Sequence, residues 1–590
     1  MRCQSRRTAT FAVLVRAACL GALLQYVLPA WPQSAPDPSL EQRRRQQRED
    51  AQRRRLEPNP EVRLQAPAAT PPGRLPASES PCFAIRAVRW AWADAADASV
   101  LAAWQPWLDA SLAGADGNDS PLSRCLGAAG VRVLQERAQG ALLARGYTTS
   151  RVLIAPQDLS GGVLALTLVP GRIHAIRLAD PHEKHASLQS ALPIKPGDIL
   201  NLRDLEHGLE NLKRPPMADA DIKIEPAQAL PGQPAAGPGE SDLVVSWRQG
   251  GPLRLNVGAD NGGTRETGQY QGSVTLSWDN PLGLNDLLYL SLNHDLGGGM
   301  PGGRGTHGGA AHYEVPWGYW LLGLTGSQYN YYQSIAGATS TIVYAGTGGA
   351  NEVALSRVVQ RDARGKTILT AKAWQRSASN FINDTEIAVQ RRVEGGWELG
   401  AERSQAIGAA VLNARAAYKQ GTGAFGSLAA PEEAFGEGTS RFGLISAGVT
   451  LGVPFKAAGQ LLRYGSEWRA QFNRTPLTPL DQFAIGGRYT VRGFDGEQQL
   501  AAEHGWLWRN EIGWALGGIG QELYAGIDHG EVGGPSAANL VGTQLTGGVL
   551  GLRGRLHQMQ YDLFVGAPIA KPQYFSTSPW TVGFSLNWAY

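Results

Sequence analysis

The stretch Thr581-Val-Gly-Phe-Ser-Leu-Asn-Trp-Ala-Tyr590 alternates strictly between two kinds of residue. Its even-numbered positions hold large apolar or aromatic residues, and its odd-numbered positions hold small or polar ones. Successive side chains of a β-strand point to opposite faces, so this pattern predicts a strand with one apolar face and one small, polar face. Residues 270–278 and 443–453 repeat the pattern. The last part of the chain is therefore predicted to consist of strands.

From residue 251 onward this alternation replaces the helical period, and 57 of the 74 glycines follow residue 250. Strands of about 9–11 residues with one apolar face and aromatic ends are typical of a transmembrane β-barrel, whose closure pairs every backbone polar group. At about 20 residues for a strand and its loop, residues 251–590 predict about 16 antiparallel strands. A soluble β-sandwich is the alternative, and the apolar strand at 581–590 favours the barrel.

The composition excludes several classes of protein. The 590 residues include 54 Lys and Arg against 51 Asp and Glu, so the net charge of +3 gives no basic field for nucleic acid. The mean hydropathy is -0.22, and no apolar run after residue 40 approaches the ~20 residues of a membrane-spanning helix. Strand serines lack a Gly-x-Ser-x-Gly context, and the 10 histidines show no ligand spacing. We predict no enzyme, no cofactor and no metal site.

The cysteines indicate the compartment. Residues 1–34 combine early arginines with an apolar stretch, which predicts a cleaved signal peptide. Two of the 4 cysteines, Cys3 and Cys19, lie inside it. The remaining pair, Cys82 and Cys125, predicts a disulfide in an oxidising compartment, with two separate buried thiols as the alternative.

Two polar segments follow the predicted signal peptide. Residues 36–57 are rich in arginine and in good helix formers, with Glu41/Arg45 and Glu49/Arg53 at i,i+4 spacing. This predicted helix has no apolar stripe and cannot dock on a core, so it lies either in solvent or inside a wet, polar cavity. The proline-rich residues 58–81 predict an extended linker.

Residues 82–250 predict two similar α+β units, 82–170 and 171–250, each in the order strand, helix, helix, strand, strand. The helix that follows Asn201 has one clean apolar face, made of Leu202, Leu205, Leu209 and Leu212. The predicted strands are 83–92, 151–155, 163–169, 172–178, 221–225 and 243–247, and the other helices are 98–112 and 127–145.

A glycine-flanked segment, Gly486–Gly496, lies between two predicted strands and has the length to fold back into the pore. An arginine at its tip needs an acidic partner once it is partly desolvated. Period two in residues 522–528 turns Asp528 toward the lumen and makes it a candidate partner of Arg492. The alternative is a solvent-exposed loop arginine and an ordinary lumen aspartate.

These residues resemble a known family. Val491-Arg-Gly-Phe494 matches the loop-six motif of the outer-membrane barrels that assemble or secrete proteins, and Tyr524-Ala-Gly-Ile-Asp528 resembles its partner motif. The two α+β units resemble POTRA domains. Two such units behind a polar helix and a linker are similar to the two-partner secretion (TpsB) transporters of filamentous haemagglutinin and haemolysin. The proline- and glycine-rich residues 231–239 depart from that pattern as an insertion.

The resemblance implies roles for particular residues. Val491, Arg492, Gly493 and Phe494 would form a loop motif in the barrel lumen, with Arg492 salt-bridged to Asp528. The helix of residues 36–57 would plug the resting pore. Substrate would bind to POTRA strand edges and to the helix around four leucines, Leu202, Leu205, Leu209 and Leu212.

The resemblance also implies a function and a location. The chain would export one large β-helical, TpsA-type exoprotein, unfolded and without ATP, across a Gram-negative outer membrane, with the POTRA domains in the periplasm. Outer-membrane lipids including lipopolysaccharide and the barrel-assembly machinery are the other expected partners. A barrel-assembly insertase of the same superfamily is the first alternative, and a solute porin is the second.

Overall fold

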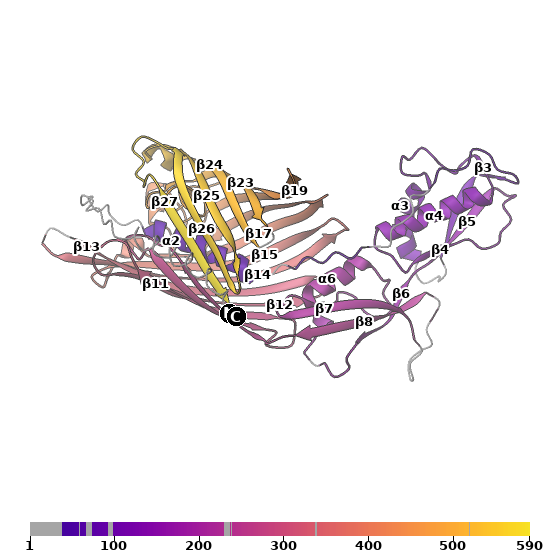
Figure 1. Ribbon diagram of the computed structural model, residues 1–590, viewed down its shortest axis with the longest axis horizontal. Coiled ribbons are helices and arrows are strands. Elements are labelled where there is room, and N and C mark those ends of the chain that lie inside the picture. The colour runs from indigo at the N-terminus through magenta and orange to yellow at the C-terminus, as the bar shows by residue number, and fades with distance from the viewer. Residues whose placement is uncertain are drawn as a thin grey trace, which may run out of the picture. The chain divides into compact units, whose positions relative to one another are not determined.

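The computed structural model describes residues 38–57, 60–65, 73–92, 98–183, 185–228, 237, 239–336, 339–517 and 520–590. The predicted signal peptide, most of 231–239 and part of the predicted linker lie outside these residues. Within them, none of the helices combines the length and the apolar character needed to cross a membrane. The described chain runs from a long polar helix through two small α+β units into a β-barrel (Figure 1).

The described strands of the barrel form one closed, antiparallel ring of sixteen, in agreement with the predicted fold class. The last strand pairs with the first, with Trp588 opposite Val257, so the ring has no free edge. The sixteen strands are β9 (Leu253–Asp260), β10 (Tyr270–Asp279), β11 (Leu287–Gly297), β12 (Arg304–Trp317), β13 (Trp320–Ala336), β14 (Thr341–Arg361), β15 (Gly365–Ile382), β17 (Arg392–Ile407), β18 (Ala410–Thr422), β19 (Gly443–Ala457), β20 (Gln460–Asn473), β23 (His504–Leu516), β24 (Gln521–Gly533), β25 (Gln544–Leu556), β26 (Met559–Ala570) and β27 (Thr581–Ala589).

Short elements lie in the barrel's loops: the two-residue β16 (Thr385–Glu386) and the 3-10 helices η2 (Ala388–Gln390), η3 (Pro431–Phe435) and η4 (Pro535–Asn539). The alternation of apolar and polar residues in the sequence corresponds to the outer and inner faces of the barrel strands. In β10, Val274, Leu276 and Trp278 are exposed on the outer face, whereas Thr275 and Ser277 are buried on the inner face. The apolar face is therefore the one that meets lipid.

The first α+β unit contains β1 (Phe83–Ile85), β2 (Ala87–Trp92), α3 (Ala98–Leu112), β3 (Arg124–Leu126), α4 (Ala128–Ala144), β4 (Arg151–Leu153) and β5 (Val163–Val169). The single strand predicted over 83–92 is two strands, which is a correction. β1 pairs with β3, whereas β2 runs parallel to β5 in the sheet β2-β5-β4. At Arg86 the chain changes from pairing with β3 to pairing with β5. The three residues of β3 are too few to show a periodic pattern in the sequence.

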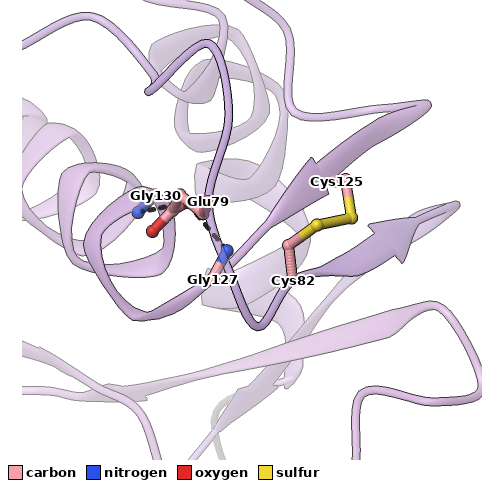
Figure 2. Close-up of a disulfide and its surroundings, with 5 residues drawn as sticks. All are labelled: Glu79, Cys82, Cys125, Gly127 and Gly130. Carbon is pink, nitrogen blue, oxygen red and sulfur yellow. Dashed lines mark hydrogen bonds between the residues drawn. A yellow bond between two sulfur atoms is a disulfide. The ribbon is translucent and has the colours of Figure 1, made fainter.

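A disulfide and a capped helix hold the start of this unit (Figure 2). Cys82 and Cys125 are joined, with their Cα atoms 5.2 Å apart. Beside them, the carboxylate of Glu79 accepts hydrogen bonds from the backbone N–H groups of Gly127 and Gly130 at the N-terminus of α4, at 2.7 and 3.0 Å. A negative charge there satisfies free N–H groups and opposes the positive end of the helix dipole. The end of the linker is thereby fixed to the first unit.

Replacing Cys82 and Cys125 together by serine should lower the free energy of unfolding of this unit by about 2–5 kcal/mol, because the bond joins positions 43 apart in sequence. Pulse proteolysis of the full chain in increasing urea measures the change. Reductant should reproduce the loss in the wild type and leave the double variant unchanged. A wild type that resists protease equally with and without reductant would contradict this assignment.

The second unit contains β6 (Arg172–Leu178), α5 (Leu188–Ala191), α6 (Leu202–Leu212), β7 (Ala218–Pro226) and β8 (Glu240–Gln249), with β8 between β6 and β7. Asn201 caps α6 by accepting a hydrogen bond from the N–H of Arg203 at 2.8 Å. All four leucines predicted to contact substrate are buried in the core of this unit: Leu202, Leu205, Leu209 and Leu212. Their apolar face packs on the sheet, so that part of the predicted substrate site is wrong.

Candidate functional site in the barrel lumen

The polar helix α2 (Pro38–Leu56) contacts the inner wall of the barrel along its length (Figure 1). Near its start, Arg43 Nη1 donates to the carbonyl oxygen of Pro479 at 2.6 Å. In its second half, Gln52 Nε2 donates to the hydroxyl oxygens of Thr275 and Ser291 at 2.9 and 3.2 Å. Arg55 Nη1 reaches Asn587 Oδ1 at 3.1 Å. A helix that is polar on all sides is compatible with a polar lumen, where the wall can bond to side chains on several of its faces.

The ion pairs within α2 differ from the predicted ones. Arg45 pairs with Glu49 at 2.7 Å and Arg53 pairs with Glu57 at 3.0 Å, instead of Glu41 with Arg45 and Glu49 with Arg53. Glu41 accepts a hydrogen bond from the hydroxyl of Thr267 on the barrel at 3.0 Å. Polar groups of the barrel compete with neighbouring helix residues for the side chains of α2. The i,i+4 spacing alone therefore could not predict which ion pairs form.

With the helix in place, the lumen keeps a cavity of about 1080 Å³ beside it. The cavity is lined by α2 together with polar residues of many barrel strands, among them Ser327, Lys372 and Arg415. That volume corresponds to the pocket of a drug-sized ligand.

The loop between β20 and β23 folds inward, as the glycine-flanked sequence predicts. It begins and ends with a short antiparallel pair, β21 (Phe483–Ile485) and β22 (Leu500–Ala502). Val491 and Phe494 are buried in an apolar cluster with wall and loop residues, and Phe494 packs edge-on against Phe575 at 5.7 Å. Apolar packing of this kind holds the loop inside the lumen.

The structure brings Arg492 and Asp528 together. Arg492 Nε and Nη2 donate to the two carboxylate oxygens of Asp528 at 2.7 and 2.9 Å, and the backbone N–H of Arg492 donates to Asp528 Oδ2 at 3.0 Å. Asp528 is 0% exposed and Arg492 is 7% exposed. A bidentate pair with a third, backbone hydrogen bond fixes both the charge and the direction of the loop tip.

Glu511 on β23 also takes part, although the sequence analysis missed it. Its Oε2 accepts from Arg492 Nη1 at 2.6 Å, and its Oε1 accepts from Arg553 Nη2 at 2.5 Å. Arg509, two residues earlier on the same face, lies directly opposite Asp528, with its Nε 3.6 Å from Asp528 Oδ2. Two charged residues at i,i+2 spacing in a strand that also holds three tryptophans are the signal that could have identified them.

Glycines of the barrel wall form the seat of the loop. A Cβ on Gly547 would lie 1.8 Å from the carbonyl oxygen of Arg492, and one on Gly526 would lie 2.7 Å from its Nη2. A Cβ on Gly566 would lie 2.8 Å from the Cα of Gly493, which itself has a φ of 99°. The backbones approach too closely for any side chain, which explains why glycines occur here in three neighbouring strands.

Gly547→Ala should push the loop from this seat. Overpacking costs about 1–3 kcal/mol, so we expect proteolytic cleavage within residues 486–499 to be about 5- to 150-fold faster, as measured by mass spectrometry. Gly548→Ala is the matched control, because the Cβ there meets only the flexible end of Ile569, at 3.2 Å. Equal cleavage rates in the two variants would refute the role of the seat.

A buried ion network links the linker, α6 of the second unit and the β14–β15 turn. Arg361 donates to Glu206 Oε2 at 3.1 Å, to Glu210 Oε2 at 2.8 Å and to the carbonyl oxygen of Val62 at 2.7 Å. The backbone N–H groups of Val62 and Leu64 donate in turn to the two glutamates, at 3.0 and 2.7 Å. The linker is thus held on the polar face of α6, opposite its leucines.

Burial alone would raise the pKa of the Glu210 carboxyl, but the neighbouring His207, the hydrogen bonds from Arg361 and the charge of Lys366 outweigh it. These partners hold the pKa of Glu210 below its usual range. The carboxyl therefore stays ionised at neutral pH, and the network keeps its full charge.

Comparison with known proteins identifies the family to which this combination of domains belongs. The family described as haemolysin secretion/activation protein ShlB/FhaC/HecB matches residues 239–554. A POTRA domain of the ShlB type matches residues 118–171, and a second POTRA domain matches residues 172–226. The matches therefore cover the larger part of each α+β unit and most of the barrel.

Similar proteins of comparable length carry transporter names. The chain is 37% identical to the outer membrane transporter CdiB-2 of Burkholderia pseudomallei over 92% of both chains. It is 24% identical to the hemolysin transporter HpmB of Proteus mirabilis over 76% of this chain and 77% of that one. The solved structure of CdiB from Acinetobacter baumannii superposes with a TM-score of 0.80 at 30% identity, covering 95% of this chain and 100% of that chain. This chain belongs to the haemolysin secretion/activation family ShlB/FhaC/HecB, the outer-membrane transporters of two-partner secretion.

Proposed function

We propose that this transporter exports one large secreted protein in an unfolded state through the barrel lumen, after α2 has left it. The observation that carries the proposal is the polar helix in the lumen beside an inward loop held by Arg492 and Asp528. The helix closes the resting pore, and the loop shapes the wall past which the substrate moves. A relative named for haemolysin transport supports a secreted protein as the cargo.

The contacts of α2 support its departure. Several are hydrogen bonds to neutral groups, such as those from Arg43 to Pro479 and from Gln52 to Thr275 and Ser291. Water can replace each of them at a net cost of about 0.5–1.5 kcal/mol for a neutral donor and about 1.5–3 kcal/mol for an arginine. Substrate that binds in the periplasm and competes for the linker then shifts the helix out of the lumen.

Strand edges of the POTRA domains are the proposed capture surface, since the leucines of α6 are buried. In the second unit the outer strands of the sheet are β6 and β7, and in the first they are β2 and β4. An unfolded chain can add to such an edge through backbone hydrogen bonds, which need no folded substrate. Folding of the exported chain outside the cell would give the transport its direction without ATP.

The remaining partners belong to the proposal as well. The cargo is a large β-helical exoprotein of the TpsA type. The barrel reaches the outer membrane through the barrel-assembly machinery and contacts lipopolysaccharide there. The transporter acts without enzymatic chemistry or a cofactor.

Co-production of the chain with the large secreted-type protein encoded beside it tests this function. We expect that protein in the medium only when the transporter is present, with equal amounts of cargo inside the cells in both strains. A barrel correctly inserted beside that cargo, with the cargo retained in the periplasm, would refute export of that protein and favour the insertase alternative.

A further inference from the structure

Three ligand-type side chains meet where α2 ends: Glu57, which follows the helix, and His312 and Glu314 on β12. Their ligand atoms all lie within 4.8 Å of one another. Glu57 extends the last turn of the helix, because its backbone N–H donates to the carbonyl oxygen of Arg53 at 2.8 Å. The cluster therefore joins the end of the helix to the barrel wall.

The imidazole of His312 points into this cluster with one nitrogen unpaired. His312 is 3% exposed, and its Nδ1 lies 2.8 Å from the hydroxyl oxygen of Thr325. Its Nε2 is buried and makes no hydrogen bond to any described residue. Instead it faces Glu57 Oε1 at 3.5 Å and Glu314 Oε2 at 3.6 Å. These separations are too long for good hydrogen bonds.

The same separations fit ligands that share one cation. A tetrahedral zinc ion with bonds of about 2.0–2.1 Å keeps its ligands about 3.4 Å apart. Imidazole combined with carboxylates suits zinc or a similar transition metal, whereas magnesium and calcium prefer oxygen ligands alone. The two distances at His312 Nε2 therefore match the edges of a zinc tetrahedron.

The surroundings orient each ligand. The hydrogen bond to Thr325 fixes the ring of His312, and Tyr289 stacks on that ring at 5.0 Å while donating to Glu57 Oε1 at 3.0 Å. Arg53 holds Glu57 through the same Oε1 at 3.0 Å, and Arg214 holds Glu314 through Oε1 at 3.0 Å, which leaves Glu314 Oε2 turned toward His312.

Arg53 and Arg214 are positively charged, so they repel a metal ion bound beside them. We therefore expect micromolar affinity, weaker than that of a closed structural zinc site.

We propose that Glu57, His312 and Glu314 bind one zinc-type transition-metal ion that fastens the end of α2 to β12. Binding of the ion depends only on the three ligands. Its consequence, slower departure of the helix, rests on the proposed function, because it requires α2 to be the plug. The ion would then act as a latch on the closed pore.

Cobalt(II) titration of the purified full chain in detergent tests the site, because tetrahedral cobalt has strong visible absorption bands. We expect one ion per chain. His312→Gln should abolish the bands, and Glu57→Gln, which leaves every barrel strand unchanged, should weaken binding about tenfold or more. His307→Gln is the matched control, since it removes another imidazole of β12, one near Asn330 instead of the cluster. Equal binding by wild type and His312→Gln, or no tetrahedral bands in the wild type, would overturn the site.

Conductance in planar bilayers tests the latch separately. Micromolar zinc should lower the opening frequency of wild-type pores and leave His312→Gln pores unchanged. Tetrahedral cobalt binding together with zinc-independent opening would overturn the latch. A transporter that secretes nothing would still show the cobalt bands, so failure of the export proposal is distinguishable from failure of the site.

Discussion

Arg492→Ala is expected to reduce secretion of the cognate exoprotein about tenfold or more, with the barrel still inserted in the outer membrane. Arg492 and Asp528 are buried and joined by two side-chain hydrogen bonds at 2.7 and 2.9 Å. Removing one partner of a buried pair costs about 3–5 kcal/mol. The carboxylate of Asp528 loses both guanidinium hydrogen bonds, and Arg509 Nε, at 3.6 Å, is too far away to replace them. The seated loop would then lose more than about a hundredfold in relative population. Exoprotein in the medium, normalised to transporter in the membrane, measures the effect.

Arg488→Ala is the matched control for this prediction. Arg488 lies in the same loop, but its contacts are longer, at 3.4 Å to Asn261 Oδ1 and 3.7 Å to Asp260 Oδ1. We expect it to keep most of the secretion. Exchanging the charges of Arg492 and Asp528 together should restore more secretion than either single exchange. Equal loss in the single and double exchanges would show that direct pairing is not what the loop requires.

Deleting residues 38–57 is expected to convert a nearly closed channel into a wide, stable pore. The helix occupies the lumen, with a cavity of about 1080 Å³ beside it, whereas a sixteen-stranded barrel without a plug leaves an aqueous channel. Single-channel conductance in planar bilayers should rise several-fold, with long open times.

A synthetic peptide of residues 38–57 supplied in trans provides the control for the deletion. It should close the pore again, because its contacts along the wall, such as Gln52 with Ser291 and Arg55 with Asn587, are specific in register. A scrambled peptide of the same composition should close it less well. Unchanged conductance after the deletion would show that another element blocks the lumen.

Much of the architecture could be predicted because strands and helices leave periodic signals. The alternation in 443–453 and 581–590 located β19 and β27, and the apolar face of Leu202 to Leu212 located α6. The same apolar face led to the wrong prediction that these leucines contact substrate. A stripe of leucines indicates that the face is buried, but it does not indicate whether a sheet or a substrate buries it.

The inward loop could be predicted from a motif, but its full set of partners could not. Arg492 and Asp528 stand in recognisable sequences, whereas Glu511 becomes a partner only through the register of β23 against β24. The proposed metal-binding residues could not be predicted from the sequence either. His312 and Glu314 are two residues apart on one strand, yet Glu57 joins them from a helix that the sequence could place only in solvent or in some polar cavity.

In the proposed mechanism, the exported chain uses the space that α2 occupies at rest. Cysteines at positions 52 and 291, where Gln52 and Ser291 are in contact at 3.2 Å, allow a short thiol-reactive crosslinker with a cleavable bond to tether the helix to the wall. Cells with the single Gln52→Cys variant receive the same reagent as the control.

Secretion should stop in the tethered double variant, continue in the single variant, and resume when the crosslinker is cleaved. Secretion at the full rate with the helix demonstrably tethered would show that the exported chain does not need the space that α2 occupies.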